Sequence, residues 1–192
     1  MEAADEIALY LLVEQQPGAY RKLVSEFGSA ALALAASARG WRALGINPKH
    51  CDARAAWPQG TACEDIRHQW RKSLSWLEGE HRGVWLDSER NQLPEGAWPR
   101  AFAEVPKRPP LLFWQGDETV MGLPQIAVVG SRAATRTGLA TAQTIAVELA
   151  QTGLVVTSGL ASGIDGAAHA GALSVQGKTI AVLGCGLDRV YP

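Results

Sequence analysis

The last third of the chain alternates three short apolar runs with two helix-like stretches. In chain order, the apolar runs are IAVVG (126–130), LVVTSG (154–159) and TIAVLGCG (179–186). Residues 137–153 and 162–177 lie between them. The loops are short, and right-handed crossovers between such strands make them parallel. The pattern predicts the α/β fold class, with a Rossmann-like parallel sheet in which the order β-α-β-α-β is visible but incomplete over residues 126–192.

The residue patterns inside these segments support the assignment. The first run is continuously apolar, which is typical of a strand that is buried on both faces of a parallel sheet. Residues 137–153 have the spacing of an amphipathic helix. Its expected inner face consists of Leu139, Ala142, Ile145, Ala146 and Leu149. Gly153 and Gly177 are expected to end the two helices.

Each expected strand ends in a turn that contains glycine. The turns are Gly130-Ser131-Arg132, then Ser158-Gly159 followed by Ser162-Gly163, and Gly184-Cys185-Gly186. Because the carboxyl ends of parallel strands meet at one edge of a sheet, we expect these turns to lie together where such folds bind ligands. Glycines let a ligand approach the backbone, helix N-termini favour anions, and arginine binds phosphate with two hydrogen bonds. The sequence therefore predicts a phosphate-binding site at this edge.

Ser131, Asp165 and His169 are candidate DNA- or phosphate-binding residues at this edge, and each also has a structural interpretation. A serine such as Ser131 commonly caps a helix, and the helix dipole favours a carboxylate such as Asp165 in the first helical turn. His169 follows Asp165 by one turn, so the two side chains are within reach of each other. Two interpretations of this pair remain: an acid–base pair and a structural hydrogen bond. No nucleophile–base pair or second carboxylate accompanies them, so we expect no catalytic residues.

The first 83 residues are expected to form a small all-α domain. Apolar residues recur at helical spacing in three segments, 6–15, 19–28 and 61–80. Residues 29–45 are expected to add a helix that Ser29 caps. The pattern resembles sterile-alpha-motif or helix-hairpin-helix domains. We favour a scaffold or protein-contact module over DNA binding, because the basic and acidic residues balance over residues 1–110.

Residues 84–125 are predicted to be a linker or lead-in segment with short strands. Prolines at positions 106, 109, 110 and 124 break helices there. The segments VWL (84–86) and PPLLFWQGD (109–117) have the apolar content of short strands. The predicted organisation is therefore a helical domain over 1–83, the lead-in over 84–125, and the Rossmann-like domain over 126–192.

Composition limits the possible functions. Hydrophobic residues make up 47% of the chain and charged residues 19%, which suits a packed core. The net charge of −1 gives no global attraction for nucleic acid or an acidic membrane, so anion binding has to come from local groups. The acidic N-terminus lacks the basic start of a signal peptide, and no apolar run reaches membrane-spanning length. We expect a cytoplasmic protein with no membrane partner.

The cysteines do not indicate a metal site. They are Cys51, Cys63 and Cys185, and none forms a C-x-x-C pair. Cys63 and His68 are five residues apart, but no second close pair completes a set of zinc ligands. We expect reduced thiols that are mostly buried, and neither a metal nor a cofactor.

Several segments resemble the DprA/Smf DNA-processing family. They are VVGSRAATRTG, VTSGLASGIDGAAHAGAL and TIAVLGCGLDRVYP, with PPLLFWQGD similar to the lead-in of that family. The likeness is specific from Ile126 to Pro192, moderate over 98–117 and weak before that. It implies a Rossmann-like domain that binds single-stranded DNA without sequence preference and is not an enzyme. It also implies a role in loading the RecA recombinase onto incoming strands during natural transformation, and a homodimer in the intact family.

The resemblance assigns roles to particular residues. It implies that Gly130, Ser131 and Arg132 line a phosphate-binding pocket. The neighbouring turns of that pocket match Ser158, Gly159, Gly163 and Gly184 to Gly186.

The chain departs from the family pattern at two points. Ser162 stands where the family usually has arginine or lysine, which removes a positive charge or shifts its role to Arg132 and Arg136. The family also continues beyond the position of Pro192, so we expect a fragment whose DNA binding and self-association are weaker than those of the intact proteins.

Two enzyme classes on related folds are alternatives. Lysine-decarboxylase-like phosphoribohydrolases are similar at the first turn but need a P-G-G-x-G-T-x-x-E signature, which this chain lacks. An NAD oxidoreductase needs G-x-G-x-x-G and an acidic residue after the second strand. The chain has Thr157-Ser158-Gly159 at that position, so we set this class aside.

Overall fold

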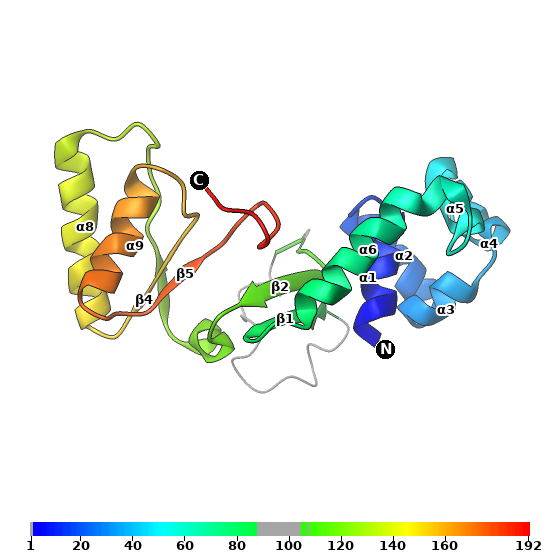
Figure 1. Ribbon diagram of the computed structural model, residues 1–192, viewed down its shortest axis with the longest axis horizontal. Coiled ribbons are helices and arrows are strands. Elements are labelled where there is room, and N and C mark those ends of the chain that lie inside the picture. The colour runs from blue at the N-terminus through cyan, green and yellow to red at the C-terminus, as the bar shows by residue number, and fades with distance from the viewer. Residues whose placement is uncertain (1, 88–104, 107) are drawn as a thin grey trace. The chain divides into compact units, whose positions relative to one another are not determined.

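A computed structural model describes residues 2–87, 105–106 and 108–192 (Figure 1). These residues form two compact units, one ending at Gly116 and one beginning at Asp117. Much of the predicted lead-in, residues 88–104, lies outside the described residues. The predicted domain boundaries after residues 83 and 125 stay predictions.

The first unit is helical, as the sequence indicates. Its helices are α1 (Glu2–Leu12), α2 (Pro17–Phe27), α3 (Ala30–Ala35), α4 (Ala38–Ala43), α5 (Pro48–Ala56), the 3₁₀ turn η1 (Thr61–Cys63) and α6 (Glu64–Leu77). Leu9, Leu23 and Trp41 are fully buried in one cluster. The indole N–H of Trp41 donates to the carbonyl oxygen of Ala33 at 2.9 Å, so this buried ring leaves no unpaired donor. The likeness to a sterile-alpha-motif domain stays a prediction.

The helix expected over residues 29–45 is in fact two helices. Ser29 caps the first as predicted, since its hydroxyl accepts from the N–H of Leu32 at 3.2 Å. The first helix ends at Ala35, and Ser37 caps the second by accepting from the N–H of Gly40 at 3.2 Å. A serine hydroxyl competes for backbone donors and favours a new helix start over continuation.

Two antiparallel strands complete the first unit. They are β1 (Arg82–Leu86) and β2 (Leu111–Gln115), with Arg82 opposite Gln115 and Leu86 opposite Leu111. Leu86 and Leu111 form a second buried cluster with Ile7 of α1. This antiparallel strand pair buries apolar side chains of α1 that the helices alone would leave exposed.

The second unit is a three-stranded parallel sheet with two helices (Figure 1). Its elements are the 3₁₀ turn η3 (Glu118–Gly122), β3 (Gln125–Ala127), α8 (Arg136–Gln151), β4 (Val155–Ser158), α9 (Ile164–Ser174) and β5 (Thr179–Ala181). The strand order is β3-β4-β5, and Val156 at the centre lies opposite Ile126 on one side and Thr179 on the other. The predicted parallel sheet and its β-α-β-α-β order are confirmed.

Both helices of this unit pack on the same face of the sheet. Ala146 of α8 and Ala168 of α9 form one buried cluster with Val156 of β4. Strands that follow one another in spatial order have crossovers that turn the same way, so their helices share one side. The expectation that the first strand is buried on both faces is therefore wrong. Ile126 is 39% exposed and Val129 is 74% exposed, and the central strand β4 is the buried one.

The predicted inner face of α8 also needs a correction. Ala142 and Ala146 are buried, but Ile145 is 45% exposed. The reason is the close packing of α9, where a Cβ at Gly171 would lie 2.5 Å from the carbonyl oxygen of Gln143. Small residues bring the helices together along a narrow stripe, which leaves Ile145 outside it.

The turn after β3 and the N-terminus of α9 fit tightly against each other. Gly163 precedes α9 with φ at +89°, and a Cβ there would lie 2.2 Å from the carbonyl oxygen of Ser131. That oxygen accepts a hydrogen bond from the N–H of Ile164 at 3.2 Å. A Cβ at Gly130 would in turn lie 2.7 Å from Cγ1 of Ile164. Glycine is therefore required on both sides of this contact.

A buried histidine links α9 to the sheet. His169 is 5% exposed, and its Nδ1 lies 2.6 Å from Oγ1 of Thr179. The Thr179 hydroxyl donates to the carbonyl oxygen of Val156 at 2.7 Å, so it accepts from Nδ1–H. Nε2 of His169 is buried and has no hydrogen-bond partner among the described residues. Burial lowers the pKa of His169, and the nearby Asp165 carboxylate opposes this shift.

The fit at Gly163 predicts a large effect of Gly163→Ala. The new methyl group meets backbone atoms in a positive-φ conformation, so we expect a loss of about 2–4 kcal/mol in the free energy of unfolding. Urea denaturation followed by circular dichroism measures it. Gly184→Ala is the matched control, since a Cβ there meets nothing within 4 Å. Equal stability of the two variants would contradict the packing described here.

The neutral His169 predicts that the second unit loses stability in acid. The folded-state pKa lies below the unfolded value, so the unfolded chain takes up a proton first as the pH falls through about 6.5. The loss is at most about 1.4 kcal/mol per pH unit. Urea midpoints between pH 7.5 and 5.5 should fall more steeply for the wild type than for His169→Gln. Replacement of the exposed His81 by Gln serves as the control and should leave the wild-type slope unchanged.

Candidate functional site

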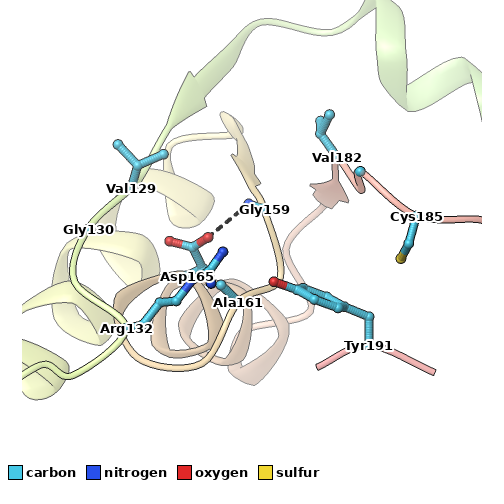
Figure 2. Close-up of a pocket in the computed structure, with 10 residues that line it drawn as sticks. Val129, Gly130, Arg132, Gly159, Ala161, Asp165, Val182, Cys185 and Tyr191 are labelled. Atoms are coloured by element: carbon cyan, nitrogen blue, oxygen red, sulfur yellow. Dashed lines mark hydrogen bonds between the residues drawn. The ribbon is translucent and has the colours of Figure 1, made fainter. Parts of the chain in front are cut away.

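A pocket of about 520 Å³ opens at the carboxyl edge of the parallel sheet (Figure 2). Its walls come from the turns that follow β3, β4 and β5, from the start of α9, and from Tyr191 further along the chain. The lining residues are Val129, Gly130, Arg132, Gly159, Ala161, Asp165, Val182, Gly184, Cys185 and Tyr191. The size is within the usual range for small-ligand sites. The turns that the sequence expected to lie together do so.

The first turn contributes one charged side chain to the pocket. Arg132 is exposed and lines the pocket, and in Figure 2 its side chain points into it. Arg136 is also exposed but does not line the pocket. Residues 117–192 contain four basic and five acidic residues, so Arg132 acts without support from the net charge of the unit.

Ser131 shapes the first turn rather than the pocket wall. Its Oγ accepts from the N–H of Ala133 at 3.1 Å, and it is not among the lining residues. The interpretation of Ser131 as a helix cap is wrong, because α8 begins only at Arg136. Its cap is Thr135, whose Oγ1 accepts from the N–H of Gly138 at 3.1 Å.

The second turn is split between structural and lining residues. Ser158 is buried, and its hydroxyl donates to the carbonyl oxygen of Val128 at 2.6 Å, which ties β4 to the end of β3. Gly159 lines the pocket, whereas Ser162 and Gly163 do not. Ser162 is exposed, and Gly163 contacts the first turn.

Asp165 and His169 bond to different partners. Oδ2 of Asp165 accepts from the N–H of Gly159 at 3.2 Å (Figure 2), and the side chain lines the pocket. His169 bonds to Thr179 and does not line the pocket. No hydrogen bond joins the two side chains in the described part of the chain, so each has a structural partner of its own.

The third turn leaves backbone open to the pocket. Gly184 and Cys185 line it, and Gly186 does not. A Cβ at Gly184 would meet nothing within 4 Å, which shows how open this side is. Cys185 is a free thiol at this position.

Four lining residues were absent from the sequence prediction. Val129, Ala161 and Val182 supply the apolar wall, and Tyr191 supplies an aromatic ring. The valines belong to the apolar runs and carry no separate sequence signal. Tyr191 did carry one, because it is the one aromatic residue after Trp114.

The described residues contain no group of three or more His, Cys, Asp or Glu side chains that is placed to hold a metal ion. Within the same residues, every helix is too short or too polar to cross a membrane.

Comparison with known proteins gives consistent matches. The sequence model described as DNA recombination-mediator protein A matches residues 92–192. DNA processing protein DprA from Streptococcus pneumoniae is 43% identical over 98 residues, which are 51% of this chain and 34% of that protein. Protein Smf from Escherichia coli is 40% identical over 121 residues, which are 62% of this chain and 30% of that protein.

Solved structures match as well. The X-ray structure of DNA processing protein A from Streptococcus pneumoniae covers 96% of this chain with a TM-score of 0.66 and 26% identity, over 60% of its own length. A structure that describes the single-stranded DNA binding mode of DNA processing protein A from Helicobacter pylori covers 58% of this chain and 46% of its own. Its TM-score is 0.48 at 31% identity.

The alignments define how far the likeness extends. The chain spans about a third of the curated relatives described above. The family model covers more than half of the chain, and it includes all three turns of the pocket. The resemblance inferred from the strand-end motifs is confirmed, and the chain belongs to the DNA recombination-mediator protein A family, whose members include the DprA and Smf proteins.

Proposed function

We propose that this chain binds single-stranded DNA without sequence preference, with a backbone phosphate held at the turn after β3. The observation that carries the proposal is the pocket at the carboxyl edge of the sheet, where Arg132 points inward among Gly130, Gly159 and Gly184. Membership of a family of DNA-processing proteins supports DNA as the ligand.

The distribution of hydrogen bonds supports Arg132 as the main phosphate ligand. Several backbone donors near the pocket are already used within the protein. The N–H groups of Ile164 and Gly166 donate to Ser131 and Ala161, and that of Gly159 donates to Asp165. A guanidinium keeps its charge at any physiological pH and binds phosphate with two hydrogen bonds. Phosphate contacts fix the position of a strand but do not read its sequence.

The proposal describes a binding protein and not an enzyme. A nucleophile–base pair needs two side chains in hydrogen-bond reach of each other beside the substrate. His169 bonds to Thr179 outside the pocket, and Asp165 bonds to the backbone of Gly159. This arrangement supports a role for both residues in positioning the pocket wall.

The finer parts of the proposal concern partners. We propose that the whole protein helps to load the RecA recombinase onto single strands during natural transformation and that it acts as a homodimer. Support for both comes from the family motifs in residues 126–192.

The central test is Arg132→Ala. Loss of one charge-assisted phosphate contact should weaken binding of a fluorescent dT oligomer about tenfold or more at low salt. The slope of log affinity against log salt concentration should fall by about 0.7, because one fewer phosphate is neutralised. Fluorescence anisotropy at two salt concentrations, with the matching duplex in parallel, measures both effects.

Lys178→Ala is the matched control for this test. It removes the same charge from an exposed residue just before β5, at the opposite edge of the sheet. It should change affinity less than twofold. Equal binding by the wild type and Arg132→Ala would refute the pocket assignment, and release of free base from a nucleoside monophosphate would favour the phosphoribohydrolase alternative.

A further inference from the structure

The apolar part of the pocket is exposed and lies outside the core of its unit. Val129 is 74% exposed and Val182 is 54% exposed, although both line the pocket. The buried cluster of the second unit lies between its helices and Val156 of β4, and neither exposed valine belongs to it. Exposed apolar side chains that gather around a hollow are typical of a binding surface.

These two valines lie on either side of the central strand. The N–H of Val128 donates to the carbonyl oxygen of Thr157 at 3.0 Å, and the N–H of Val182 donates to that of Ser158 at 2.8 Å. The two bonds fix the ends of β3 and β5 beside the end of β4, where Gly159 follows. The central strand therefore adds no side chain of its own at this point of the pocket wall.

Tyr191 adds an aromatic ring to this apolar surface. It is half-buried, and Figure 2 shows its ring in the pocket with the hydroxyl end toward Ala161. Among the described residues, nothing pairs with its ring or forms a hydrogen bond with its hydroxyl. A buried tyrosine of a core usually has a partner for its hydroxyl, and Tyr191 is not part of the core cluster. The ring therefore serves the pocket and not the core.

A phosphate group cannot use this apolar surface. Charged oxygens gain nothing from contact with valine or a tyrosine ring, because such contacts only remove water from them. The volume of about 520 Å³ also exceeds what one phosphate needs. A nucleobase is flat and largely apolar on its faces, and it stacks on an aromatic ring whatever its identity. Since Arg132 lines the same pocket, one nucleotide can offer its phosphate to the arginine and its base to the apolar wall.

We infer that Tyr191 stacks on a base of the strand whose phosphate Arg132 binds, with Val129 and Val182 as the apolar walls of this base site. The inference rests on the proposed function and adds to it a residue that selects unpaired strands. In a duplex each base face is covered by the neighbouring base pair, so the ring is accessible only to an unpaired base. Stacking does not read the base, so the site has no sequence preference.

The test compares a dT oligomer with an abasic oligomer of the same length, which has the same number of phosphates but no bases. The wild-type chain should bind the dT oligomer about tenfold more tightly, the factor expected for one stacked base. This ratio should be the same at two salt concentrations, because stacking displaces no counterions. In Tyr191→Ala the ratio should fall to about twofold or less, whereas Tyr191→Phe keeps the ring and should keep the wild-type ratio.

The controls separate this inference from loss of folding and from the proposed function. Circular dichroism shows whether Tyr191→Ala folds, and its binding of the abasic oligomer should equal that of the wild type. Val190→Ala changes the adjacent residue, which is 98% exposed and does not line the pocket, and should keep the wild-type ratio.

Three outcomes would overturn the role of Tyr191 and leave phosphate binding in place. They are equal binding of the two oligomers by the wild type, a wild-type ratio in Tyr191→Ala, and loss of the ratio in Tyr191→Phe. Absence of binding to either oligomer by the wild type contradicts the proposed function and this inference together.

Discussion

The pocket depends on one close contact between two turns. The carbonyl oxygen of Ser131 lies where a side chain at position 163 would otherwise be, and it accepts the N–H of Ile164. Gly130 leaves the matching space for the side chain of Ile164. The two turns pack directly against each other, so Arg132 and Asp165 line one pocket although they are more than thirty residues apart in the sequence.

This contact also occupies a backbone donor that a helix N-terminus would otherwise offer to an anion. Helix N-termini bind anions through free N–H groups. At α9, the N–H of Ile164 goes to the neighbouring turn, that of Gly166 to Ala161 and that of Ala167 to Gly163. The helix end therefore serves mainly to join the turns. Positive charge at the pocket comes from the side chain of Arg132, which stands where dinucleotide-binding folds place a glycine.

The sequence predicted the fold well because the strand-end glycines and the spacing of apolar residues determine the local turns, helices and strands. The parallel order and the meeting of three turns follow from chain connectivity alone. Features that depend on contacts between residues distant in the sequence could not be predicted. Ile126 looks like a doubly buried strand residue, and only the placement of both helices on one face leaves it exposed. Ser131 looks like a helix cap until the helix start at Arg136 is known. Tyr191 stands out in the sequence as an aromatic residue, but the path of the chain after β5 that brings it to the pocket could not be predicted.

The pocket has a single arginine beside a buried carboxylate, and this limits the electrostatic contribution to the free energy of binding a nucleic-acid strand. Counterion release scales with the number of phosphates that are neutralised, and one arginine neutralises about one. The second unit adds little, since its acidic residues outnumber its basic ones. Under the proposed function, affinity at physiological salt then depends on contacts that salt does not weaken, namely stacking on Tyr191 and apolar cover by Val129 and Val182. A duplex hides its base faces and edges and offers only phosphates. Under the proposed function, the opposite charges of Arg132 and Asp165 leave the contacts to exposed base faces, which only a single strand offers, to supply most of the binding energy.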